Sequence, residues 1–221
     1  MATGPNSGLI ELITDSTSLD HLKRHPAYTS LRAHFEAAYG GVDSAAFGAA
    51  QHAFTCSLAA YSMVSYVLGI KDRHNGNLLL DRQGRLTHID FGFVLGKAPG
   101  GVASLEASVP FKLTREMVDV MGGPTAPLFT QTFVELCTAA LQAIRARAQE
   151  ILGLAEITAE GMPCFQGAGA APLAGLRARM LLDVPDRELR PRVAALVAAS
   201  HGNMNTYLYD RFQRMSNGIS E

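Results

Sequence analysis

Apolar residues recur at helical spacing over long stretches of the chain, and capping residues mark where those stretches begin. Segment 18–40 offers Ser18 as a cap and is interrupted near Pro26. Segment 43–69 predicts a long helix that opens at Asp43 or Ser44 and stops near Gly69. Its part 53–70 has no charged residue and reaches the lower length limit of a membrane span. The serines and threonine within it favour a helix enclosed by other elements.

The second half of the chain continues the helical pattern. Thr114 can cap a short helix that ends at Gly122 and Gly123. Segment 126–154 predicts one amphipathic helix, and a Gly/Ala/Pro-rich break follows at about 160–175. Two or three further helical segments are expected before the C-terminus.

Two short runs in the middle of the chain alternate in the manner of strands. They cover about 77–80 and 86–89, and the tetrad "DRQG" between them supplies the Asp and Gly of a turn. Because nothing indicates a parallel sheet, we predict a mainly α fold with one small β-hairpin.

Composition limits the function classes without naming one. The 221 residues are 48% hydrophobic and carry a formal net charge of -1, which argues against an electrostatic nucleic-acid binder. Cys56, Cys137 and Cys164 are widely separated, as expected for reduced thiols rather than a disulfide framework or a zinc site. With no secretory signal at the N-terminus, we expect a cytoplasmic protein with no nucleic-acid partner.

The predicted hairpin gathers residues suited to phosphoryl transfer. Asn77 begins its first arm and Asp90 follows its second, so pairing sets both at one end. Amide and carboxylate oxygens suit Mg²⁺, which takes one or two protein ligands beside phosphates and water. Asp72 precedes Asn77 at the Asp-to-Asn interval of the protein-kinase catalytic loop, although this chain reads Asp-Arg-His in place of His-Arg-Asp.

Together, "DRHNGNLLL" and "HIDFGF" resemble the catalytic and activation segments of the phosphatidylinositol 3-/4-kinase superfamily. The flanks "SGLIELI", "PFKLTREMVDVMGG", "MPCFQG" and "LYDRFQRMSNGI" are most similar to the type III phosphatidylinositol 4-kinases, beta class. The likeness runs from about residue 7 to 219. It implies the C-terminal lobe of a lipid-kinase catalytic domain, related to the protein-kinase fold.

The resemblance also implies roles for single residues. It makes 69–77 the catalytic loop, with Asp72 and His74 facing the inositol hydroxyl and the γ-phosphate. Which of the two takes the proton stays open. Arg73 belongs to the same loop, and pairing with a carboxylate is favoured over direct substrate contact. Asn77 and Asp90 become the metal ligands.

The activation loop that selects the lipid headgroup is then expected at about 90–114. Phe91 and Gly92 anchor its start, and Lys97 and Lys112 are candidate substrate contacts, with a solvated Lys112 equally acceptable. His88 shares a strand face with Asp90 and either lines the site or is a buried, satisfied histidine. A catalytic zinc on His74, His88 and Asp90 is a less favoured alternative.

One part of a kinase is missing from the pattern. Before Lys71 the only lysine is Lys23, inside a helical segment with no glycine-rich strand ahead of it. We therefore expect the N-terminal lobe to be absent and the isolated chain to be inactive.

The expected reaction is transfer of the γ-phosphate of ATP to the 4-hydroxyl of phosphatidylinositol. Mg²⁺ is the expected metal, with Mn²⁺ as an alternative, and protein regulators are left unspecified. The alternatives for function are a phosphatidylinositol 3-kinase and a catalytically inactive lobe that acts as an interaction module. By resemblance the protein is peripheral on Golgi or other endomembranes.

Apolar residues also mark the C-terminal segment. Leu208, Phe212 and Met215 follow helical spacing and predict a stripe that packs on the core of the domain. The alternative is that this edge dips into a membrane while Arg211 and Arg214 meet anionic headgroups.

Overall fold

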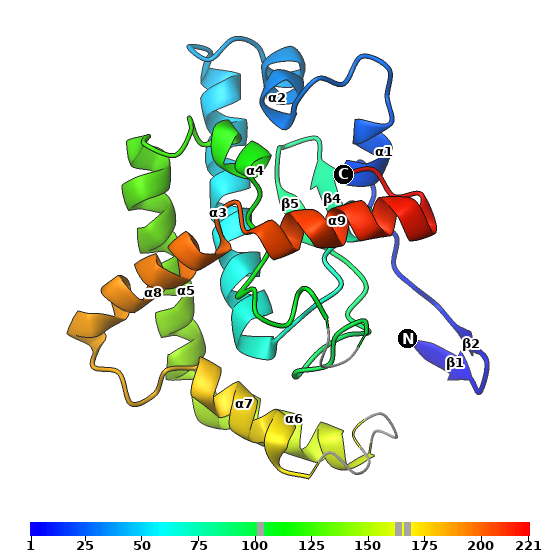
Figure 1. Ribbon diagram of the computed structural model, residues 1–221, viewed down its shortest axis with the longest axis vertical. Helices are drawn as coiled ribbons and strands as arrows, with labels where there is room; N and C mark the ends of the chain where they lie inside the picture. Colours follow the sequence, from blue (N-terminus) through cyan, green and yellow to red (C-terminus); the bar gives the residue numbers. More distant parts are fainter. Residues whose placement is uncertain (101–103, 162–164, 166–168) are drawn as a thin grey trace.

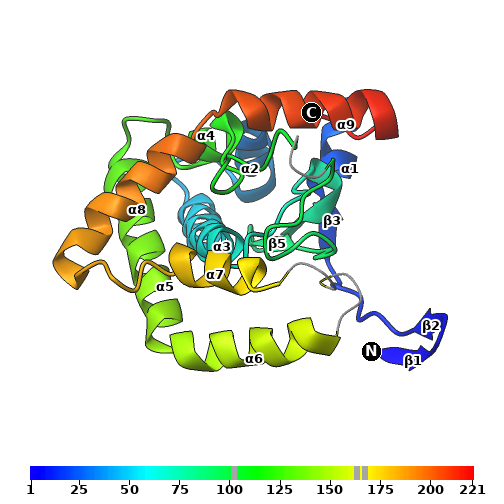
Figure 2. The same cartoon turned by 60° about the horizontal axis from the view of Figure 1, so that its bottom comes forward.

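A long central helix organises the computed structural model, which describes residues 1–100, 104–161, 165 and 169–221. This helix, α3 (Ala45–Leu68), is surrounded by shorter helices and a small sheet (Figures 1 and 2). The Ser44 hydroxyl caps its start, and Gly69 ends it with a φ of 61°. Both ends and the enclosed position agree with the sequence prediction. No helix among the described residues has the length and apolarity needed to cross a membrane.

The other helices wrap this centre in pairs. α3 packs against α5 (Val134–Ala146), and α5 against α8 (Asp186–Ser200). Likewise α2 (Leu31–Tyr39) packs against α4 (Arg115–Val120), and α6 (Ala148–Gly161) against α7 (Ala171–Arg179). The predicted caps are confirmed, because the Ser18 and Thr114 side chains accept hydrogen bonds from His21 N and Met117 N. Two further α-helices are α1 (Leu19–Lys23), which precedes α2 in the chain, and α9 (Met204–Asn217), which follows α8.

The single helix predicted over 126–154 is divided, so that prediction is wrong. A π-helical turn, η3 (Leu128–Phe133), leads into α5, and Arg147 leaves the helical conformation with φ −112° and ψ 20°. Helical propensity does not fall at this point. The break at Arg147 instead lets α6 lie against α7, and this packing places Ala148 and Leu152 in the core.

The predicted hairpin is confirmed and gains a third strand. The antiparallel order is β3-β4-β5, for β3 (Ser16–Ser18), β4 (Leu78–Asp81) and β5 (Leu86–His88). Leu78 pairs with His88, and Leu80 pairs with Leu86. At the turn Gly84 has a φ of 82°, and a Cβ there would come within 2.8 Å of Ala50 O. A separate strand pair, β1 (Ala2–Gly4) with β2 (Ser7–Gly8), lies away from the main body (Figure 1).

Most of the predicted Gly/Ala/Pro-rich break cannot be compared with the prediction. Residues 162–164 and 166–168 lie outside the described residues, and so does the third cysteine, Cys164. Within the described part, Phe165 is buried, and α7 begins at Ala171. Cys56 and Cys137 are free thiols.

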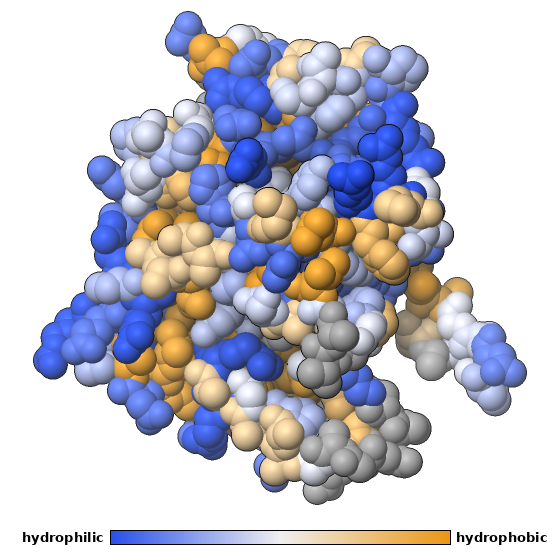
Figure 3. Space-filling model, in the orientation of Figure 1, coloured by the Kyte–Doolittle hydropathy of each residue, from blue (hydrophilic) through white to orange (hydrophobic). Residues whose placement is uncertain are grey.

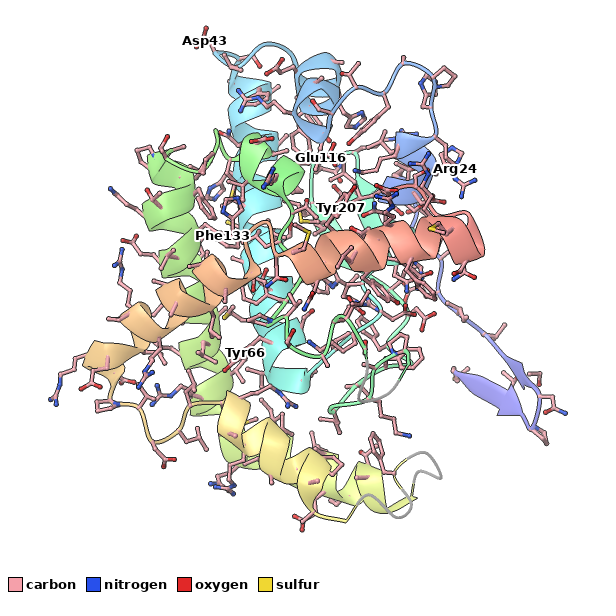
Figure 4. All side chains as sticks on the ribbon, viewed as in Figure 1. Arg24, Asp43, Tyr66, Glu116, Phe133 and Tyr207 are labelled. Atoms are coloured by element: carbon pink, nitrogen blue, oxygen red, sulfur yellow. The ribbon has the colours of Figure 1, made fainter. Side chains whose placement is uncertain are left out.

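The last helix, α9, turns its apolar stripe outward, which corrects the prediction of core packing. Leu208, Phe212 and Met215 are 40%, 53% and 80% exposed. The buried residues of this helix are Thr206, Tyr209, Asp210 and Gln213, all of which carry a polar group. Figure 3 shows apolar residues on the face of the molecule over α9. A cavity of about 540 Å³ lies beside the helix, with Tyr207 and Glu116 in its lining (Figure 4).

Candidate active site

The hairpin brings the two proposed metal ligands to one end of the small sheet. Asn77 comes directly before β4, and Asp90 comes two residues after β5. Ile89 N donates to Asn77 O at 3.1 Å and extends the pairing beyond the named strands. The catalytic loop, which runs from Gly69 into the 3₁₀ turn η1 (Asn75–Asn77), therefore lies beside the start of the activation segment.

Asp72 is held by its backbone on both sides. Its N–H donates to Glu106 Oε2 at 2.6 Å, and its carbonyl oxygen accepts from Asn77 Nδ2 at 2.9 Å. Its φ of 64° is a left-handed conformation that residues with a Cβ rarely adopt. The carboxylate Oδ1 accepts a short hydrogen bond from the Tyr209 hydroxyl of α9. These contacts fix where the side chain can point.

His74 stands next to this carboxylate in a defined tautomer. Its Nε2 is 3.9 Å from Asp72 Oδ1, and its Nδ1 accepts from Gly76 N at 3.1 Å. A Cβ on residue 76 would come within 3.1 Å of the ring, so glycine permits this approach. Burial lowers the pKa of His74; Lys112 and Arg73 lower it further, while Asp72 opposes them. The ring is therefore neutral near pH 7, with its proton on Nε2.

Arg73 is a structural clamp made with carbonyl oxygens. The side chain is 2% exposed and donates to Lys71 O at 2.9 Å and to Ile89 O at 2.7 Å. A third, short hydrogen bond reaches Asp90 O. The guanidinium also lies 5.6 Å from the centre of the Phe91 ring. Arg73 holds the loop, as predicted, but its partners are three backbone carbonyl oxygens and not the expected carboxylate. The planar guanidinium has five N–H donors and can reach all three oxygens.

Asn77 and Asp90 have oxygens suited to a magnesium ion. Because Asn77 Nδ2 is used on Asp72 O, the amide is oriented, and Asn77 Oδ1 accepts no hydrogen bond from the described residues. Asp90 is exposed, has a φ of 55°, and accepts from Gly92 N at 3.2 Å. One amide and one carboxylate oxygen match the small protein share of Mg²⁺ coordination. The next residue, Phe91, is 48% exposed.

The zinc alternative finds no support in the part of the chain that the structure describes. No group of three or more His, Cys, Asp or Glu side chains there could hold a metal ion. His88 is 7% exposed and stacks on Tyr61, with ring centres 4.5 Å apart. Its Nδ1 is buried without a partner, so the histidine is buried but not satisfied. Burial lowers the pKa of His88 to about 3.

The two predicted substrate lysines have different surroundings. Lys112 is 7% exposed, and its Nζ donates to both carboxylate oxygens of Asp210 at 2.7 and 2.8 Å and to Asn75 Oδ1 at 3.0 Å. This geometry disfavours a headgroup contact and makes a solvated lysine wrong, because the ammonium is enclosed. Lys97 lies 5.3 Å from the centre of the Phe165 ring, at a cavity of about 760 Å³ that Lys71 and Arg179 also line.

Two residues that support this site carry no local sequence signal. Glu106 accepts the backbone N–H groups of Asp72 and Arg73 from a segment without periodicity. Tyr209 belongs to α9, where the apolar stripe was the visible pattern, and Gln213 Nε2 donates to its hydroxyl at 2.7 Å. Burial, together with the Asp72 carboxylate, raises the pKa of Tyr209, so its hydroxyl keeps the proton that it donates.

Comparison with known proteins adds a family match. The model of the family described as phosphatidylinositol 3- and 4-kinase matches residues 1–167. The chain is 44% identical to a phosphatidylinositol 4-kinase of Dictyostelium discoideum, over 99% of this chain and 18% of the relative. It is 42% identical to phosphatidylinositol 4-kinase beta 2 of Arabidopsis thaliana, over 99% of this chain and 20% of the relative. It is 40% identical to phosphatidylinositol 4-kinase stt4 of Schizosaccharomyces pombe, over 99% of this chain and 11% of the relative. The chain thus spans a fifth or less of the length of these three relatives.

Proposed function

The chain belongs to the phosphatidylinositol 3- and 4-kinase family, and on that premise we propose that it is the catalytic lobe of a phosphatidylinositol 4-kinase. The proposed reaction transfers the γ-phosphate of ATP to the 4-hydroxyl of phosphatidylinositol. The observation that carries the proposal is the meeting of Asp72, His74, Asn77 and Asp90 at one end of the β4–β5 hairpin. The choice of the 4-hydroxyl over the 3-hydroxyl rests on the similar proteins, which are named as phosphatidylinositol 4-kinases.

The metal ligands and the catalytic loop have separate tasks. Asn77 Oδ1 and Asp90 would hold Mg²⁺, or Mn²⁺, which when bound offsets negative charge on the transferred phosphate. Asp72 is the better proton acceptor of its loop, because neutral His74 already carries its proton on Nε2 and has Nδ1 occupied by Gly76 N–H. His74 Nε2–H can then donate to a phosphate oxygen, which suits a transition state that is stabilised mainly by positioning and charge.

The activation segment favours an inositol ring without additional phosphates. Only Lys97 and Lys112 are basic between residues 91 and 114, and Lys112 is committed to Asp210. A headgroup that carries several phosphates would call for more available cations. We therefore retain phosphatidylinositol itself as the substrate and Lys97 as the contact from this segment.

The exposed edge of α9 supplies the membrane contact of this proposal. Phe212 and Met215 present apolar surface, and Arg211 and Arg214 lie on the same helix. An amphipathic helix of this kind lies in the interface with its apolar edge buried among the lipids. The helix also contacts the catalytic loop through Tyr209, so it would bring that loop to the bilayer surface.

The test replaces the proposed metal ligands in a polypeptide that joins this chain to a competent small lobe. Asp90→Asn and Asn77→Ala should each lower phosphatidylinositol phosphorylation at least about a hundredfold, since each removes charge stabilisation at the transferred group. The matched control is Asp81→Asn, at the turn end of the same hairpin, where the side chain caps Gln83 N and Arg85 N. Near-normal turnover by the Asp90 variant would contradict the site assignment.

A further inference from the structure

The backbone at Asp72 adopts a conformation that needs support from outside the catalytic loop. A φ of 64° is unfavourable for a residue with a Cβ, although Asp tolerates it better than most. The Asn77 side chain holds the carbonyl of Asp72 from within the loop. The N–H on the other side of the residue is held by Glu106, which lies 34 positions further along the chain.

The Glu106 carboxylate receives two successive backbone amides. Oε2 accepts from Asp72 N at 2.6 Å, and Oε1 accepts from Arg73 N at 3.4 Å. Successive N–H groups next to a left-handed residue form a concavity suited to an anion. Here a side chain of the activation segment fills it, so the second half of that segment is joined to the catalytic loop.

The carboxylate is enclosed, which makes its charge costly. Glu106 is 8% exposed, and burial raises its pKa, although the two amides and the nearby Lys71 and Lys112 act in the opposite direction. Two backbone N–H groups need two acceptor oxygens, and a carboxylate supplies both, whereas the amide of Gln would supply one. The carboxylate of Glu106 is therefore specifically suited to hold this stretch of backbone.

The same contact extends to the proposed metal site. The backbone N–H of Arg73 donates to Glu106 Oε1, and the guanidinium of the same residue donates to the carbonyl oxygens of Ile89 and Asp90. One carboxylate therefore supports the backbone of the proton acceptor directly and that of a metal ligand through one further residue.

We propose that Glu106 is a positioning residue of phosphoryl transfer: it orders the Asp72–Arg73 backbone and couples the activation segment to the catalytic loop. This inference rests on the proposed function for its kinetic consequence. Its structural consequence, order at two backbone amides, can be measured without turnover.

The kinetic test uses Glu106→Ala and Glu106→Gln in the polypeptide that includes a small lobe. Glu106→Ala should lower kcat on the order of a hundredfold, with little change in KM for ATP or lipid, because misplacement of about 1 Å has that cost. Glu106→Gln keeps one acceptor oxygen, so its kcat should fall less than that of Glu106→Ala. Glu116→Gln is the matched control, since Glu116 is likewise a glutamate held by specific contacts, but it pairs with Lys23 and lies on α4 (Figure 4). Its kcat should stay at the wild-type value.

The structural test measures amide hydrogen exchange and melting temperature of the 221-residue chain. Glu106→Ala should speed exchange at Asp72 and Arg73 at least about tenfold, while Glu116→Gln should not. At neutral pH Glu106→Gln should change the melting temperature little, because removal of a buried charge is offset by one backbone N–H that loses its acceptor. If Glu106→Ala fails to fold, kcat and amide exchange of the Glu106→Gln variant decide whether the proposal holds.

Unchanged kcat in the Gln variant, or a loss of melting temperature without a loss of kcat, would overturn the proposal. So would unchanged exchange at both amides. A wild-type protein that does not phosphorylate phosphatidylinositol, while exchange at these amides still depends on Glu106, would count against the proposed function and support the positioning contact.

Discussion

Two residues of the proposed site have an unfavourable backbone conformation. Among the residues that the structure describes, five other than glycine have a positive φ, and they include both Asp72 and Asp90. Such conformations persist when surrounding contacts determine them, and here those contacts come from Glu106, Asn77 and Arg73. The backbones of both residues are thus held by hydrogen bonds, while their carboxylates accept from the Tyr209 hydroxyl and from Gly92 N.

Replacement of Lys112 should distinguish a structural ion pair from a substrate contact. Lys112→Met leaves the Asp210 carboxylate buried without its partner, so the free energy of unfolding should fall by about 3–5 kcal/mol. The double variant Lys112→Met/Asp210→Leu should recover much of that loss, because it removes both charges. Urea unfolding of the three proteins measures this. Unchanged stability with a raised KM for the lipid would restore Lys112 as a headgroup contact.

At this scale the sequence indicates the residues proposed for a chemical task better than the residues that hold them in place. Asp72, Asn77 and Asp90 could be placed together because two strands and a short turn fix their separation. Glu106 and Tyr209 reach Asp72 across 34 and 137 positions. No local periodicity encodes such contacts, since they depend on how loops and helices pack.

At the scale of elements, α9 is amphipathic with its polar side inward. The surface it covers is itself polar: Tyr209 meets Asp72, and Asp210 meets Lys112. Helical spacing predicts a stripe but not which side faces the protein, and the usual preference for apolar burial gave the wrong side here. The apolar side is consequently left at the surface.

Phe212→Ala should test the membrane role of that surface. Because Phe212 is 53% exposed, its loss should leave the melting temperature nearly unchanged and weaken binding to vesicles of phosphatidylcholine and phosphatidylserine by about tenfold. Leu154→Ala, which removes a 66% exposed apolar side chain from α6, is the control and should bind as the wild type does. A fall in melting temperature with unchanged vesicle binding would show that Phe212 contributes to the fold instead.

The sequence predicts the ends of an element correctly where capping residues determine them. It fails where packing between elements determines them. Ser44 and Gly69 set the ends of α3 through their own backbone and side-chain chemistry. The break at Arg147 has no such residue, and α6 turns there to meet α7. Strand β3 was also missed, because "STS" has no apolar alternation and becomes a strand only by pairing with β4.

At the scale of the whole molecule, the catalytic loop is enclosed from three directions. α3 leads into it, the β4–β5 hairpin follows it, and α9 crosses over it (Figure 1). These contacts hold the residues proposed for the acceptor and metal side of the reaction. They account for the mainly α fold with a small sheet that the pattern and the family resemblance predicted.

The nucleotide side of the reaction provides the last prediction. Transfer of this kind needs a lysine on a strand and a loop over the phosphates. The only lysine before the catalytic loop, Lys23, lies in α1, and its ammonium pairs with Glu116. We therefore expect the 221-residue chain alone to bind MgATP weakly and to give no measurable phosphatidylinositol 4-phosphate. Calorimetric titration and a radiolabelled phosphate assay measure the two quantities, with the chain joined to a small lobe as the positive control. Robust product formation by the chain alone would mean that its own residues complete the nucleotide site.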